Sequence, residues 1–117
     1  MTAWHVSAAD AARAKLPEGR RSAEILRHGS LEVRWYAPKG VDPQEPHDRD
    51  EIYIIASGHG TFVRGAESVP FQANDLLFVP ARMEHRFVDF SDDFATWVMF
   101  WGPQGGEREN PFPAPER

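Results

Sequence analysis

The chain contains no cysteine among its 117 residues. Disulfides, thiolate metal ligands and cysteine nucleophiles are therefore excluded, and any metal ion must be bound through nitrogen and oxygen atoms. Positive charge is also scarce. The chain has 13 Lys and Arg but 18 Asp and Glu, which gives a net charge of -5. Without a dense basic cluster, we expect no nucleic-acid partner.

Long apolar runs are missing as well. No segment approaches the roughly 18 consecutive apolar residues of a membrane span, and residues 1–19 lack the apolar core of a signal peptide. We therefore expect no membrane partner and a cytoplasmic location.

Apolar residues are nevertheless plentiful enough for one folded domain. Hydrophobic residues make up 41% of the chain and aromatic residues 12%, so burial can offset the loss of chain entropy. Residues 1–22 read as an N-terminal extension, in which Ser7 caps a short helix over 7–15 that stops before Pro17. Residues 23–103 read as the folded domain, and 104–117 as a flexible tail rich in Pro and Gly.

Short strand patterns recur about every ten residues through the domain. They lie at 24–28, 31–37, 51–57, 61–65, 68–72, 75–80, 84–90 and 94–101. The first two, separated by His28-Gly29-Ser30, read as a hairpin. This spacing predicts an all-β sandwich or barrel.

One carboxylate stands at the start of an apolar strand, in the stretch EPHDRDEIYIIASG, residues 45–58. Alternate residues from Glu51 to Ala56 are largely apolar on both faces, so Glu51 needs an arginine, a hydrogen-bond network or a metal ion as partner. His85 begins a later strand in the same way, and His47 lies just before Glu51. Two imidazoles and one carboxylate suit non-haem Fe(II), and also Mn, Ni, Co or Zn.

These two stretches resemble the paired motifs of the cupin superfamily. The first family motif is a glycine, five residues, His-x-His, three or four residues, Glu, six residues and a glycine, and this chain matches it at His47, Glu51 and Gly58. The second is a glycine, five residues, Pro-x-Gly, two residues, His, three residues and Asn. Here Pro80 and His85 match it, while Asn74, Arg82 and Asp89 replace Gly, Gly and Asn.

The resemblance implies a single jelly-roll β-barrel with a short N-terminal helix and a loose C-terminal tail. It also implies that His47, Glu51 and His85 bind one divalent transition metal. The family's first histidine falls on Glu45 in this chain, and a shifted loop would present Gln44 instead. We favour Gln44 as the fourth ligand, because a neutral amide avoids a second anion beside Glu51.

Each of these assignments has an alternative. Glu51 could instead form a structural ion pair with Arg49, Arg82 or Arg86. Alternate strand residues point into a small barrel, and on that basis the predicted substrate pocket consists of Tyr53, Phe62, Arg64, Phe78, Phe87 and Trp97.

Three functions fit these residues. The first is a metal-dependent enzyme, of dioxygenase, lyase, decarboxylase or isomerase type, acting on a small organic substrate inside the barrel. The second is a non-catalytic module that binds or senses a small molecule or a metal. The third is a metal-free sugar epimerase or isomerase that uses His85 as a general base. We also expect a homodimer that pairs through the edge strands 24–28 and 31–37.

Overall fold

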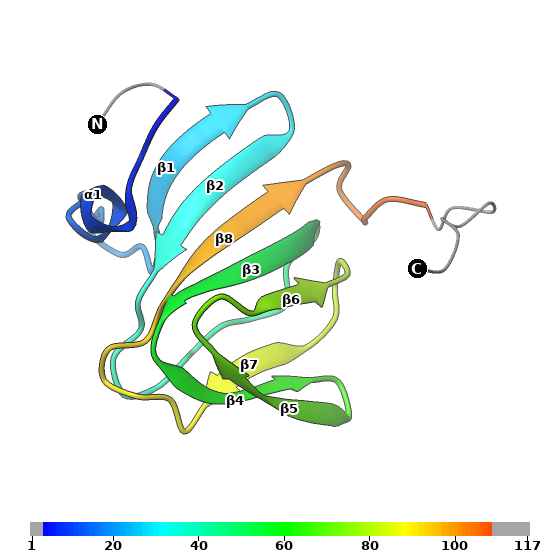
Figure 1. The fold of residues 1–117 in the computed structure, drawn as a ribbon. Helices are drawn as coiled ribbons and strands as arrows, with labels where there is room; N and C mark the ends of the chain where they lie inside the picture. Colours follow the sequence, from blue (N-terminus) through cyan, green and yellow to red (C-terminus); the bar gives the residue numbers. More distant parts are fainter. Residues whose placement is uncertain (1–3, 109–117) are drawn as a thin grey trace, which may run out of the picture.

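The computed structural model describes residues 4–108, which form one short helix and eight strands (Figure 1). The prediction of an all-β fold is confirmed. The helix is α1 (Ala8–Ala12), and the strands are β1 (Ala23–His28), β2 (Leu31–Tyr36), β3 (Asp50–Ser57), β4 (His59–Arg64), β5 (Glu67–Gln72), β6 (Leu76–Val79), β7 (His85–Val88) and β8 (Ala95–Trp101).

Helix α1 begins where the sequence predicts and ends sooner. The Ser7 hydroxyl accepts from the Asp10 N–H at 3.0 Å, and the Asp10 carboxylate accepts from the Ser7 N–H, which forms a capping box. Of the helical residues only Ala11 is buried, so little packing favours a longer helix. None of the helical structure in residues 4–108 approaches the length and apolarity of a membrane-spanning helix.

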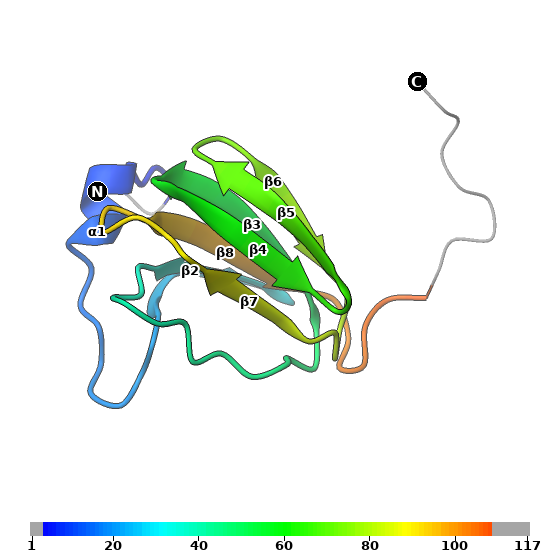
Figure 2. The ribbon, with the colours of Figure 1, turned by 90° about the horizontal axis from the view of Figure 1, so that it is seen from below.

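The strands form two antiparallel sheets. The larger has the order β1-β2-β8-β3-β6 and the smaller the order β5-β4-β7. Figure 2 shows the smaller sheet lying over the larger one. Side chains from the inner faces of both sheets meet between them, as in a jelly roll.

The chain crosses from one sheet to the other at Gly58. The chain turns a corner there, because β3 and β4 belong to different sheets. Gly58 has a φ of +87°, and a Cβ at this position would lie 2.6 Å from the Cα of Phe94. Only glycine combines this conformation with so close an approach.

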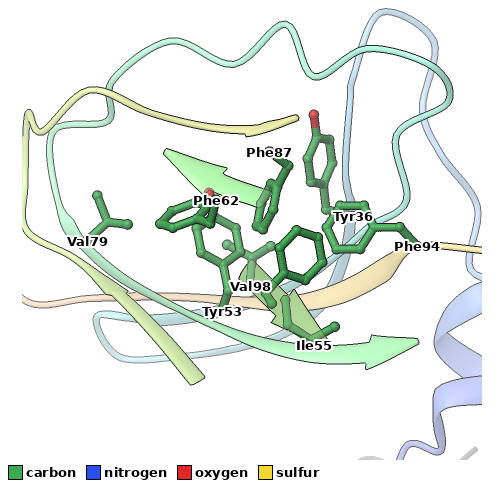
Figure 3. Packing of buried hydrophobic residues seen from close by; sticks show 9 residues of the cluster. Tyr36, Tyr53, Ile55, Phe62, Val79, Phe87, Phe94 and Val98 are labelled. Carbon is green, nitrogen blue, oxygen red and sulfur yellow. The ribbon is translucent and has the colours of Figure 1, made fainter. Parts of the chain in front are cut away.

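Aromatic rings fill the space between the sheets (Figure 3). The centroid of the Phe87 ring lies 4.9 Å from that of Tyr53, 4.8 Å from that of Phe62 and 4.6 Å from that of Phe94. Such pairs add about 0.5–1.5 kcal/mol each beyond burial. The cluster therefore fixes the position of Tyr53, a residue of the candidate site.

The beginning of the predicted tail is attached to the domain. The Gly105 N–H donates to the carbonyl of Asp48 at 2.6 Å, and the Glu107 N–H donates to the carboxylate of Asp50 at 2.8 Å. These bonds hold residues 104–108 against the start of β3. The rest of the predicted tail, 109–117, lies outside the described residues.

Candidate metal centre

The structure brings His47, Glu51 and His85 together. One ligand atom from each lies within 4.8 Å of the others. Glu51 lies near the start of β3 and His85 at the start of β7, in opposite sheets, so the two side chains approach each other across the interior. His47 reaches them from the loop that precedes β3.

Two contacts place His47. Its carbonyl accepts from the N–H of Arg82 at 2.6 Å, which ties its loop to the turn between β6 and β7. Its ring packs edge-on against Phe100 of β8, with centroids 5.0 Å apart. The two motifs that are far apart in the sequence are therefore joined through the backbone as well as at the site.

Glu51 lacks the hydrogen-bond donors that a buried carboxylate normally has. The residue is 1% exposed, and neither of its oxygens accepts a hydrogen bond from any residue in 4–108. Its Oε1 lies 2.9 Å from Nε2 of His85, although this contact does not have the geometry of a hydrogen bond. None of the predicted arginines Arg49, Arg82 and Arg86 forms an ion pair with Glu51 among the contacts found in the described residues.

The tautomer of His85 explains why the contact between His85 and Glu51 needs a positive charge. Nδ1 of His85 lies 2.9 Å from the carbonyl oxygen of Met83. Because a carbonyl can only accept, Nδ1 carries a proton, and Nε2 of the neutral ring presents its lone pair. That lone pair faces the Glu51 carboxylate at 2.9 Å. Two acceptors this close require a cation between them, either a proton or a metal ion.

The surroundings shift the pKa values of His47 and His85 in opposite directions. Burial alone lowers the pKa of His85, but attraction to the Glu51 carboxylate and the hydrogen bond with the carbonyl of Met83 outweigh it, and the pKa is raised. For His47 burial dominates, and its pKa is lowered despite the attraction of Glu51. His47 is therefore readily available as a neutral ligand, while a metal ion would have to compete with a proton for Nε2 of His85.

Gln44 points into the site and Glu45 does not. The side-chain N–H of Gln44 donates to Asp42 at 2.8 Å, which turns Oε1 inward. Oε1 then lies 2.9 Å from the hydroxyl of Tyr53 and 3.4 Å from Nε2 of His47. The Glu45 residue is exposed. This geometry favours Gln44 over Glu45 as an oxygen ligand.

Tyr53 stands at the centre of the site. It is fully buried, and its hydroxyl lies 2.9 Å both from Oε1 of Gln44 and from Nε2 of His85. Burial and the charge of Glu51 raise its pKa well above the usual value, so the phenol keeps its proton. The sequence predicts Tyr53 only as a pocket residue. Its spacing of two from Glu51 is the available sign that both share a strand face.

A cavity of about 210 Å³ opens beside His47. It is lined by Arg21, Ser22, Tyr36, Gln44, Glu45, Pro46, His47, Val98 and Phe100. None of these residues belongs to the predicted pocket. Pairing between β2 and β8 places Tyr36, Val98 and Phe100 on the inner face, but no local pattern marks Arg21 and Ser22, which come from the N-terminal extension.

The other predicted pocket residues lie elsewhere. Phe62 and Phe87 are 2% and 1% exposed and belong to the aromatic core. Arg64 and Phe78 line a separate cavity of about 330 Å³. Trp97 lies on the outer face of the large sheet, where its ring meets that of Trp35 at 5.0 Å. The predicted inward placement of Phe78 and Trp97 is wrong. Phe78 pairs with Ile52 and Trp97 pairs with Ile54, and these two residues of β3 lie on the outer face of the sheet.

Comparisons with known proteins agree with this architecture. An uncharacterised protein of Streptomyces coelicolor is 31% identical over 83 residues, which cover 69% of this chain and 79% of that protein. A Cupin 2 conserved barrel domain protein from Salinispora arenicola matches with a TM-score of 0.64 and 23% identity, over 86% of this chain and 91% of its own.

A more distant structural match is a chain from a study of the DMSP lyases RdDddP and RnDddQII. The TM-score is 0.56 and the identity 23%, over 66% of this chain and 41% of the other. At this identity the likeness concerns the fold. Residues 32–101, more than half of the chain, match the Cupin domain family, and the protein therefore belongs to the cupin family.

Proposed function

We propose that this protein binds one divalent transition metal, Fe, Mn, Ni, Co or Zn, and acts as an enzyme on a small organic substrate. The observation that carries the proposal is the buried Glu51 carboxylate, which accepts no hydrogen bond from residues 4–108 and lies 2.9 Å from Nε2 of the buried His85. A buried anion of this kind costs several kcal/mol unless a cation compensates it. The donor atoms present fit a metal ion of this class.

Four side chains would hold the ion: His47, Glu51, His85 and Gln44. Asp42 keeps the oxygen of Gln44 turned inward, and the carbonyl of Met83 selects the tautomer in which Nε2 of the neutral His85 ring carries no proton. When bound, a divalent ion with an open position supplies Lewis-acid chemistry to a bound oxygen or carbonyl group.

The cavity beside His47 supplies the place for a substrate. Gln44 and His47 both contribute to its wall, so a molecule held there touches two of the four metal-binding side chains. Tyr53 keeps a proton that it can donate to an oxygen atom at the site. Val98 and Phe100 provide an apolar wall against which a small molecule can pack.

Dioxygenase, lyase, decarboxylase and isomerase reactions are all compatible with such a site. The likeness to a chain studied with DMSP lyases makes lyase assays a reasonable early choice, although that likeness carries no substrate to this chain. Lyase reactions need no oxidant, whereas dioxygenation consumes O2. Oxygen uptake therefore separates the two.

A non-catalytic binding module is the second candidate. It is favoured by the lining of the 210 Å³ cavity, in which Glu45 is the one carboxylate and is exposed. The hydroxyl of Tyr36, also in the lining, is committed to Asp42. A metal-free isomerase is disfavoured, because the side chain of His85 is 0% exposed and its Nε2 lies 2.9 Å from both Glu51 and the hydroxyl of Tyr53.

The test is the metal content of protein purified without a nickel column. We expect about one transition metal per chain in the wild type, and its loss in His85→Ala and Glu51→Gln. His59→Ala is the matched control, since His59 is an exposed histidine at the start of β4, and it should retain the metal. Circular dichroism checks that each variant is folded.

Two outcomes would overturn the metal site. One is a wild-type protein that stays metal-free after incubation with Fe(II), Mn, Co, Ni and Zn. The other is a His85→Ala variant that keeps its full metal content. A metal-loaded protein that turns over no substrate in lyase, decarboxylase, isomerase or O2-uptake assays would favour the binding module.

A further inference from the structure

The cavity of about 330 Å³ is distinct from the one beside His47, because the two share no lining residue. Its walls come from β4, β5 and β6. Strands β5 and β6 are the edge strands of the smaller and the larger sheet, and they lie next to each other in both views (Figures 1 and 2). They belong to different sheets and form no ladder with each other among the described strands. The space between the sheets is therefore accessible from solvent on this side.

The inner faces of both sheets form the apolar walls of this cavity. Phe62 of β4 belongs to the buried core, and Val69 of β5 pairs with it, so both side chains lie on the inner face of the smaller sheet. Leu77 of β6 pairs with the buried Tyr53 and therefore lies on the inner face of the larger sheet. The cavity thus continues the hydrophobic interior outward to the surface.

The rim of the cavity is apolar as well, although it is exposed to water. Leu76 is 57% exposed, Val69 46% and Phe78 44%, and all three line this one cavity. Single exposed apolar side chains are common on protein surfaces, whereas several around one hollow mark a binding site. A bound molecule with an apolar body would remove these side chains from water.

Arg64 brings a positive charge to this apolar cavity. It follows Phe62 by two residues on β4, so its side chain extends on the same inner face. Within residues 4–108 the guanidinium donates one hydrogen bond, from Nη1 to the carbonyl of Phe78 at 3.2 Å. Its Nη2 lies 3.6 Å from Oε1 of Glu67, beyond hydrogen-bond distance. Because a guanidinium has five N–H donors, most of them remain for a ligand.

We propose that this cavity is a second ligand site, which binds a small monocarboxylate with its carboxylate on Arg64 and its apolar body between the sheets. The planar guanidinium matches the two oxygens of a carboxylate. Glu67, the one other charged residue in the lining, is acidic, which favours a single negative charge over the two of a phosphate group. The volume lies at the lower end of the roughly 300–1,000 Å³ of small-molecule pockets.

Glu67 competes with such a ligand for Arg64. Its side chain is 79% exposed, so its carboxylate can turn into water when a ligand binds, and an exposed ion pair of this kind contributes little. The structure therefore gives two substitutions with opposite effects. Loss of the Arg64 charge should weaken binding of a carboxylate, and loss of the Glu67 charge should strengthen it.

Calorimetric titration with octanoate and with phenylpropionate tests the site. We expect Arg64→Met to raise both dissociation constants about 10-fold or more, and Glu67→Gln to lower them about threefold. Arg86→Met is the matched control. Arg86 is an exposed arginine of β7 that pairs with Val63 on the outer face of the smaller sheet, and its variant should bind both probes as the wild type does. Circular dichroism checks that each variant is folded.

Two further titrations separate this site from the metal centre. Octanamide, which has the same chain without the charge, should bind the wild type about 10-fold or more weakly than octanoate, and this preference should disappear in Arg64→Met. Treatment with EDTA should leave the affinity for octanoate unchanged, because none of the four candidate metal ligands lines the cavity.

Three results would overturn the proposal. One is a wild type that binds neither octanoate nor phenylpropionate, and another is an Arg64→Met variant that binds them equally well. The third is loss of octanoate binding after EDTA treatment, which would place the carboxylate on a metal ion. The proposal does not depend on the proposed enzymatic function, since the metal content of the protein is measured separately.

Discussion

Asp42 controls the direction of Gln44. The buried carboxylate accepts from the side-chain amide of Gln44 at 2.8 Å, and Oε1 of Gln44 is thereby turned toward His47 and Tyr53. Asp42 also accepts from the hydroxyl of Tyr36 and, at 2.8 Å, from the N–H of Phe87. One carboxylate thus connects an amide at the candidate metal centre to two strands of the barrel.

Replacing Gln44 tests its role directly. We expect Gln44→Ala to weaken Zn²⁺ or Co²⁺ binding by about 10- to 100-fold, as loss of a supporting or ligating group does in other metal sites. Stability should change by less than about 1 kcal/mol, because Asp42 keeps its other donors. Competition with a chromophoric chelator measures the affinity. Glu45→Ala is the control, and a larger loss in that variant would assign the ligand to Glu45 instead.

The effect of removing the Tyr53 hydroxyl on the free energy of unfolding should depend on whether a metal ion is bound. In the metal-free protein, Tyr53→Phe removes the hydroxyl that donates to Gln44 and lies 2.9 Å from Nε2 of His85, and it should cost about 1–3 kcal/mol. With Zn²⁺ bound, the ion satisfies the same acceptors, and the cost should shrink. Urea unfolding with and without Zn²⁺ gives both values. Equal costs in the two states would contradict a shared set of acceptors.

Gly58 should tolerate no side chain. In Gly58→Ala the new Cβ would lie 2.6 Å from the Cα of Phe94, and the positive φ adds strain, so we expect a loss of about 2–4 kcal/mol. Gly19 has a φ of +77°, and a Cβ added there would meet no atom within 4 Å. Gly19→Ala should therefore lose only the strain of the positive φ, about 1–2 kcal/mol of the free energy of unfolding. Similar losses in both would mean that φ alone matters.

Glycine should be favourable at one position where this chain lacks it. Asn74, Arg82 and Asp89 have φ values of 75°, 69° and 51°, and they stand where the second cupin motif has Gly, Gly and Asn. Arg82→Gly should stabilise the protein by up to about 1 kcal/mol by removing left-handed strain. The ion pair that it loses, with Asp48 at 3.6 Å, is largely exposed and contributes little.

The control for that variant is Arg86→Gly. Arg86 is an exposed residue within β7, and glycine in a strand costs about 0.5–1 kcal/mol relative to alanine. Thermal unfolding of both variants compares them under the same conditions. If Arg82→Gly is the less stable of the two variants, backbone strain at residue 82 does not contribute significantly to the free energy of unfolding.

Much of the fold could be predicted because its turns are marked locally. Glycine, proline and polar clusters separate the strands, and the spacing of His47, Glu51 and His85 follows a recognisable pattern. The direction of the side chains on β3 and β8 could not be predicted. Both faces of these strands are apolar, so the two-residue alternation that distinguishes inside from outside is absent, and the predicted face of Trp97 is the wrong one.

The network around Glu51 could not be predicted for a different reason. Asp42 and Gln44 lie in a polar loop, where carboxylates and amides are usually solvated. Their burial depends on Tyr36 and Phe87, which come from other strands. Such contacts follow from tertiary packing and leave no periodic trace in the sequence.

The hydrogen bond from Arg82 to the carbonyl of His47 has a mechanical consequence. This bond connects the loop that carries His47 to the turn that leads into His85. Displacement of this loop, for entry of a ligand or release of a product, must either break this hydrogen bond or move the turn before His85 with it. The two imidazoles therefore respond as a coupled pair, and a disturbance at the mouth of the cavity reaches both at once.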